Sequence, residues 1–124
     1  MWAYVTIAIG GVLGCWARYG MTISVQAWLG RGFPYATLSV NVVACLLIGF
    51  LFTLTMERMI VAPAIRIGIL TGFIGGFSTF STFAMETFLL AEKGDWGRGA
   101  LYVFLSLLLG LAATVAGVVV ARTI

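Results

Sequence analysis

The chain has few of the residues on which most enzymes and metal sites depend. Its 124 residues include no histidine, two cysteines, two prolines and four acids, and only 9% of the residues are charged. The acids all lie near predicted helix ends or in loops: Glu57, Glu86, Glu92 and Asp95. General acid–base catalysis therefore has almost no candidate groups, and we expect a protein that is not an enzyme.

Neither the cysteines nor the cations form a binding motif. Cys15 and Cys45 each lie inside an apolar run, and their spacing matches no metal or redox motif. The formal net charge is +3, but the arginines are scattered along the chain instead of forming a basic cluster. We therefore expect two free thiols and no nucleic-acid partner.

What the chain has in abundance is apolar sequence. Hydrophobic residues make up 62% of it and the mean hydropathy is +1.14, values that exclude an ordinary soluble domain of this size. Four uncharged runs approach or exceed the roughly 20 residues that a helix needs to cross a bilayer. They are Met1 to Ala17, Gly32 to Met56, Ile67 to Met85 and Gly99 to Ala121. We predict one all-α integral membrane domain, residues 1–124, with four transmembrane helices at about 2–28, 35–57, 65–91 and 97–122.

The third run contains an unusual stretch, GFIGGFSTFSTF, from Gly72 to Phe83. Gly72, Gly75 and Gly76 each weaken a helix interior by about 1 kcal/mol relative to alanine, and serines and threonines follow at once. We therefore expect the third helix to be broken in the middle of the membrane. Such a break survives in hydrocarbon only where it is buried in protein, filled by an ion or open to a water-filled cavity. The stretch thus predicts a binding or conduction site.

Two kinds of ligand suit this stretch. Phe77, Phe80 and Phe83 recur at every third residue and share a face if the helix resumes, either as lipid-facing or core rings or as part of a site. Their ring edges are electropositive, and Ser81 and Thr82 add hydroxyl donors, so that a small anion could be held there. The carbonyls freed by a break instead favour a hard cation such as Na⁺.

Other polar side chains lie within the apolar helices. Asn41 either joins two helices or lines a polar path. Arg18 either faces a vestibule that attracts anions or snorkels to the membrane interface, and Glu86 either marks that interface or lies at a pore mouth. Tyr102 and Ser106 are one turn apart and place two hydroxyls on one face of the fourth helix.

Small residues mark the expected helix contacts. Gly10 and Gly14 have the four-residue spacing that lets membrane helices approach closely. Gly110 and Gly117 supply similar small surfaces in the last helix, so we expect both sets to serve packing.

The distribution of charge favours a dimer. With four spans, the cations outside the first helix divide equally between the two sides, Arg58, Arg66 and Arg122 against Arg31, Lys93 and Arg98. The positive-inside rule then gives the chain no preferred orientation. Four helices of this length also fill their own centre with side chains and leave no aqueous path. We therefore predict a dual-topology antiparallel homodimer that brings two breaks together near the midplane.

Three stretches together, GGVLGCWARY, TLSVN and GFIGGFSTFSTF, resemble the Fluc or CrcB family of bacterial fluoride channels. The resemblance covers all four helices. It implies a dual-topology antiparallel dimer in the bacterial inner (cytoplasmic) membrane, with two fluoride pathways and a central structural Na⁺. It also implies passive export that lowers cytoplasmic fluoride, without coupling to ATP or protons.

The resemblance also implies which residues of this chain form the fluoride pathway: Asn41, Phe80, Ser81, Thr82, Phe83, Tyr102 and Ser106. Phe80 and Phe83 match the family's pore phenylalanines, and Asn41 matches its pore asparagine. Na⁺ would be held by the backbone carbonyls of Gly75 and Ser78.

Two other interpretations use the same features. A small dual-topology drug or cation exporter also has four short helices, but it needs an acid in its first helix, where this chain has Arg18. A structural membrane subunit would explain the glycines by packing alone, and would leave the pattern of phenylalanine, hydroxyl and amide groups unexplained.

Overall fold

The computed structural model describes residues 1–58 and 60–124, which are almost entirely helical and contain no strand. The helices are α1 (Trp2–Leu29), α2 (Tyr35–Glu57), α3 (Pro63–Ile67), the π-helix η1 (Gly68–Ile74), α4 (Gly75–Phe77), α5 (Phe80–Glu92) and α6 (Trp96–Thr123). The prediction of an all-α chain is confirmed.

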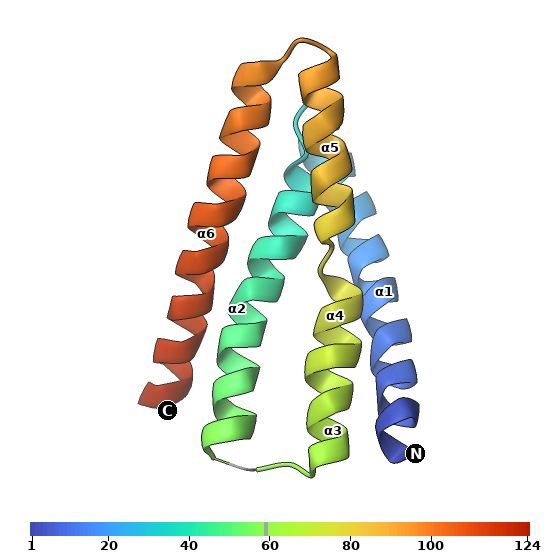
Figure 1. The fold of residues 1–124 in the computed structure, drawn as a ribbon, viewed down its shortest axis with the longest axis vertical. Coiled ribbons are helices and arrows are strands. Elements are labelled where there is room, and N and C mark those ends of the chain that lie inside the picture. The colour runs from blue at the N-terminus through green and yellow to red at the C-terminus, as the bar shows by residue number, and fades with distance from the viewer. Residues whose placement is uncertain (59) are drawn as a thin grey trace.

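The long helices lie side by side along one axis (Figure 1). α2 packs along α6, while α1 packs against η1 and α4. α3, η1, α4 and α5 follow one another as a column beside α2. Both chain termini and the α2–α3 connection lie at one end of the molecule, and the α1–α2 and α5–α6 connections lie at the other.

The helix ends follow from local chemistry. Gly30 and Gly94 follow the ends of α1 and α5 with φ of 78° and 80°, a left-handed conformation that glycine adopts without a Cβ clash. Pro63 is the first residue of α3, where its missing N–H costs no hydrogen bond. Thr79 caps α5, because its hydroxyl accepts the backbone N–H of Thr82.

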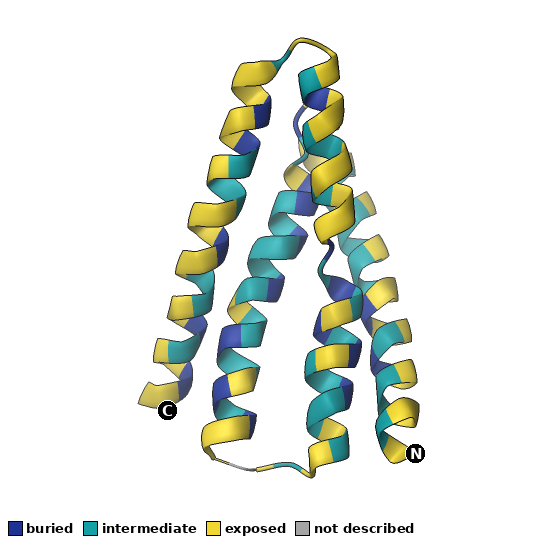
Figure 2. Cartoon of the chain, in the orientation of Figure 1, coloured by how far each residue is buried: buried dark blue, intermediate teal, exposed yellow. Residues whose placement is uncertain are grey.

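Among the described residues, three segments are long and apolar enough to cross a membrane: Tyr35–Glu57, Pro63–Glu92 and Trp96–Thr123. α1 has the length, with 28 residues, but it is less apolar and contains Arg18. The outward helix faces are widely exposed (Figure 2), and on α6 they carry side chains such as Leu107, Leu111 and Val115. So much exposed apolar surface is suited to lipid instead of water.

Glycines set the distance between α1 and the column beside it. A Cβ on Gly10 would overlap the backbone carbonyl of Gly68, and one on Gly14 would overlap the carbonyl of Phe73. Gly117 meets the backbone of α2 in the same way. The prediction of close helix packing is confirmed for Gly10, Gly14 and Gly117, whereas the Cβ position of Gly110 meets only the side chain of Cys45, at 3.3 Å from Sγ.

Gly14→Ala is expected to destabilise the folded protein by about 1–3 kcal/mol, because the added methyl group has no space and must push α1 away from η1. Gly20→Ala is the matched control. It lies in the same helix with nothing within 4 Å of its Cβ position, so the gain in helix propensity should leave stability equal or raised. Thermal unfolding in detergent measures both, and equal effects of the two variants would contradict the packing argument.

The column beside α2 leaves helical geometry at two residues. Ser78 and Thr79 have extended backbones, with φ and ψ of −76° and 158° and of −150° and 109°. Gly72 lies within η1, and Gly75 and Gly76 are the first residues of α4. The three glycines that were expected to break the helix are therefore helical themselves. The reason is tertiary, because Gly72 and Gly76 face the backbone of α1 and are used for close approach.

Candidate functional site

Asn41 of α2 holds the non-helical residues in place. Its Nδ2 donates to the carbonyl oxygen of Thr79 at 2.9 Å, and its Oδ1 accepts the N–H of Thr79 at 2.8 Å. In a continuous helix that N–H would donate to the carbonyl of Gly75, four residues earlier. The amide of Asn41 therefore replaces hydrogen bonds that the interruption removes, and Nδ2 carries a second hydrogen that this pairing does not use.

Three residues of the predicted pathway lie on the outer surface of this chain. Phe80 is 79% exposed, and Ser81 and Thr82 are also exposed. Gly75 is exposed as well, with nothing within 4 Å of its Cβ position. Polar groups of this kind are costly against hydrocarbon. This surface, which we call the Phe80 face, is thus unlike the aliphatic surface of α6.

A second group of predicted residues lies between α5 and α6. Tyr102 is fully buried, with its ring centroid 5.1 Å from that of Phe83 and 5.7 Å from that of Phe33. Its hydroxyl donates to Oε1 of Glu86 across 3.4 Å. Ser106, one turn further along α6, has a buried Oγ with no hydrogen-bond partner among the residues that the structure describes. A buried hydroxyl of this kind can still donate to a ligand.

The phenylalanines do not share one face. Phe80 and Phe83 adjoin, with ring centroids 5.6 Å apart. Phe77 is only 4% exposed, lies in the core beside Ile74 and stacks on Phe73 at 6.1 Å. The prediction of a shared face was wrong for Phe77, because two extended residues separate it from Phe80 and reset the rotation of the helix.

Arg18 of α1 points toward the interruption. Its Nη1 lies 3.4 Å from the carbonyl oxygen of Ser78, and its side chain is half-buried. The guanidinium thus lies beside the non-helical residues and places a positive charge next to one of the two carbonyls predicted to bind Na⁺.

The structure thus arranges the predicted residues in two groups joined by Phe83. The first contains the Phe80 face and the second contains Tyr102, Glu86 and Ser106. Asn41 lies behind the interruption and contacts it through Thr79.

Comparison with known proteins identifies the family. A family model described as CrcB-like protein, Camphor Resistance (CrcB), matches residues 5–118. The chain belongs to the CrcB family. A relative from Acidithiobacillus ferrooxidans, named fluoride-specific ion channel FluC, is 56% identical over 111 residues, which cover 90% of this chain and 89% of the relative. Relatives of the same name from Geobacter metallireducens and Magnetococcus marinus are 46% and 43% identical, over 98% and 95% of this chain and 98% and 96% of their own lengths.

Membership of the CrcB family confirms the resemblance seen in the sequence. The named relatives are ion channels, which supports the expectation that this chain is not an enzyme. Together with the three long apolar segments, the family makes this a multi-pass membrane protein.

Sequence reasoning missed the part played by Thr79. Its backbone pairs with Asn41, and its hydroxyl donates to the hydroxyl of Thr82 at 2.9 Å while capping α5. A threonine is one of the residues preferred at the N-cap of a helix, so Thr79 could have indicated from the sequence that a new helix begins at Phe80.

Proposed function

We propose that this chain forms a fluoride-selective ion channel, which exports fluoride passively across the bacterial cytoplasmic membrane and lowers cytoplasmic fluoride. The observation that carries the proposal is similarity over nearly the whole chain to relatives named fluoride-specific ion channels, at up to 56% identity among those compared. The relatives' names favour this function over a drug or cation exporter.

The site offers a physical route for such an anion. Ring edges of Phe80 and Phe83 attract negative charge weakly, and the hydroxyls of Ser81 and Thr82 can donate hydrogen bonds. Conduction needs sites that admit an ion and still release it, a condition that rings and hydroxyls meet better than a contacting arginine would. From Phe83 the ion would pass to the hydroxyls of the Tyr102 group, including the unpartnered Oγ of Ser106.

The functional unit is proposed to be a dual-topology antiparallel homodimer of four-span subunits. At 1.5 Å per residue the 28 residues of α1 reach about 42 Å, enough for a fourth span. The equal division of cations between the two sides supports both orientations. A second, inverted copy would also cover the Phe80 face, which a single chain leaves exposed. Tagging each terminus separately tests this, and one fixed orientation would contradict it.

A central Na⁺ is proposed to be held by the carbonyls of Gly75 and Ser78 from two copies. Asn41 takes the N–H that would otherwise bond the carbonyl of Gly75, so this oxygen is available, and oxygen atoms are the ligands that hard cations prefer. The carbonyl oxygen of Ser78 would be shared with Nη1 of Arg18, which lies 3.4 Å away. The described residues contain no cluster of three or more acidic or cysteine side chains that could hold a metal ion.

Removal of Na⁺ should therefore lower the stability of the dimer. We expect replacement of Na⁺ by the larger N-methylglucamine cation to lower the thermal midpoint in detergent by several degrees, because a ligand bound only to the assembled state stabilises it. If the thermal midpoint were the same without Na⁺ and with a 100-fold excess of Na⁺, that result would argue against the proposed site.

Fluoride efflux from liposomes tests the function directly. Purified protein is reconstituted into vesicles loaded with potassium fluoride, and an electrode records release once valinomycin lets potassium follow. The proposal predicts rapid efflux of fluoride and little efflux of chloride from matched vesicles. Proton-coupled drug movement would favour the exporter, and the absence of any flux would favour a structural subunit.

A further inference from the structure

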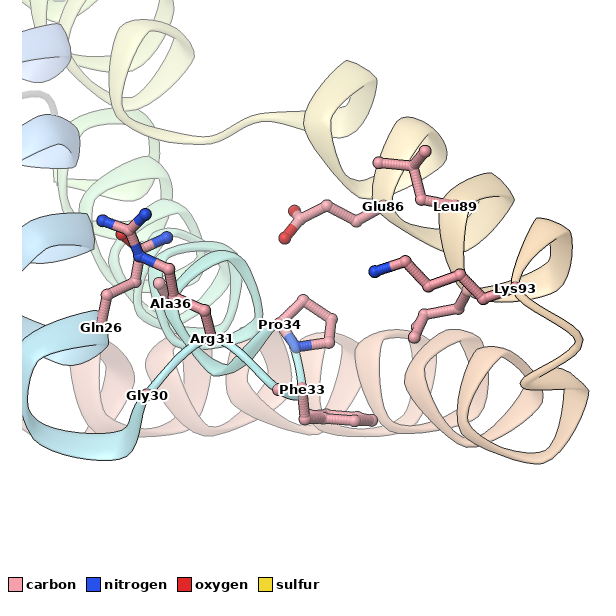
Figure 3. A pocket seen from close by; sticks show the side chains of 11 residues that line it. Gln26, Gly30, Arg31, Phe33, Pro34, Ala36, Glu86, Leu89 and Lys93 are labelled. Carbon is pink, nitrogen blue, oxygen red and sulfur yellow. The ribbon is translucent and has the colours of Figure 1, made fainter.

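A pocket outside the predicted pathway opens at the end of the molecule that carries the α1–α2 connection. Its volume is about 230 Å³, and it lies between that connection and the last turns of α5. Figure 3 shows Glu86 of α5 and Lys93, the residue after α5, reaching into this space, and the side chain of Arg31 extending from the connection beside Gln26. The walls between these charges include the apolar side chains of Phe33 and Leu90.

The pocket adjoins the Tyr102 group. Glu86 lines the pocket and accepts the hydroxyl of Tyr102, whose ring contacts Phe83 in turn. An ion that leaves the buried hydroxyls along α5 would therefore enter this pocket next. Sequence spacing alone does not connect Arg31 or Lys93 to the pathway, because they lie more than sixty residues apart and in different connections.

The charge of the pocket is positive. Arg31 and Lys93 both line it, against the single carboxylate of Glu86. Within residues 1–58 and 60–124, the ion pairs are Arg98 with Asp95 and Arg122 with Glu57, so neither pocket cation has a carboxylate within 4 Å. With two cations against one carboxylate, the recess carries an excess of positive charge, and such an excess concentrates anions at the opening.

We propose that Arg31 and Lys93 form an anion-collecting mouth at the outer end of the pathway, which raises the local concentration of fluoride without binding it tightly. This inference rests on the proposed channel function. Both cations are exposed, so water and salt screen them, and their effect should be on the rate of ion entry. The Debye length is about 30 Å at 0.01 M ionic strength and about 3 Å at 1 M, so the effect should disappear in concentrated salt.

Fluoride currents in planar bilayers of uncharged phosphatidylcholine test the mouth. The neutral double variant Arg31→Gln/Lys93→Gln should conduct about threefold less than the original protein at 10 mM potassium fluoride, and equally at 1 M ionic strength made up with potassium gluconate. The charge-retaining variant Arg31→Lys/Lys93→Arg should conduct like the original protein at both. Arg66→Gln, which removes a cation outside the pocket, should leave the current unchanged.

Each contrary result has a distinct meaning. If the neutral double variant and the original protein gave equal currents at low salt, or if the loss of current persisted at 1 M ionic strength, the proposed mouth would be contradicted. The channel function would remain in place. A loss that occurs only in bilayers containing phosphatidylglycerol would assign the two cations to lipid headgroups and would also overturn the mouth. If the original protein passes no fluoride, the proposed function fails, and the mouth fails with it.

Discussion

Phe80→Ile is expected to lower fluoride flux by about 100-fold or more, equivalent to about 2.7 kcal/mol in the barrier, while leaving the chain folded. Phe80 is 79% exposed, so replacing it by an apolar side chain of similar size removes little packing from this chain. What is lost is the electropositive ring edge beside Ser81 and Thr82, which isoleucine cannot supply. Fluoride efflux from liposomes measures the loss, and the elution volume in detergent reports whether the protein remains assembled.

The matched control is Phe88→Ile. Phe88 lies on the same helix, α5, and is 57% exposed, but it is two turns away from the interruption. We expect its flux to stay within about twofold of the original. Normal conduction by Phe80→Ile would show that its ring faces lipid, and equal losses in both variants would point to a general effect on α5.

The overall class of the fold could be predicted because a bilayer leaves few choices. Long apolar runs must satisfy their backbone groups internally, and a helix does this from local sequence alone. Local residues also accompany the helix ends, such as Gly94 after α5 and Pro63, the first residue of α3, although the third helix was predicted to begin at about residue 65. Close packing through Gly10 and Gly14 was visible for the same reason, since their spacing is a property of one helix.

The position of the interruption could not be predicted from propensity. Gly72 and Gly76 are weak helix formers, yet both are helical in the structure. Because they have no side chain, the backbone of α1 packs directly against them, and this packing outweighs their low helix propensity. The chain instead becomes extended at Ser78 and Thr79, where Asn41 supplies a donor and an acceptor. That partner is 38 residues away in sequence, so no local pattern reveals it.

The candidate site was predictable in residue type more than in arrangement. Hydroxyl and ring groups were recognisable in the motif, but the burial of Phe77 and the exposure of Phe80 depend on the rotation introduced between them. The contact between Tyr102 and Glu86 joins two helices across the α5–α6 connection. Both features require the packed structure.

Asn41→Asp is expected to reduce fluoride flux by about 100-fold or more. The carboxylate keeps an acceptor for the N–H of Thr79, but it places a second oxygen 2.9 Å from the carbonyl of Thr79, where the amide had a donor. Two acceptors in contact within a half-buried site repel each other, and the new negative charge also opposes an approaching anion. Both effects act at the residues that shape the Phe80 face, so the interruption and the pathway should fail together.

Two further variants separate these causes. Asn41→Ala removes both hydrogen bonds without adding charge, so it should destabilise the protein by about 1–3 kcal/mol and lower flux less than Asn41→Asp does. Thr53→Val is the control on the same helix, since its hydroxyl bonds only the carbonyl of Gly49 within α2, and its flux should be nearly unchanged. Normal conduction by Asn41→Asp would show that the hydrogen bond from the Asn41 amide to the carbonyl of Thr79 is dispensable. The non-helical residues would then have to be stabilised by packing against α1.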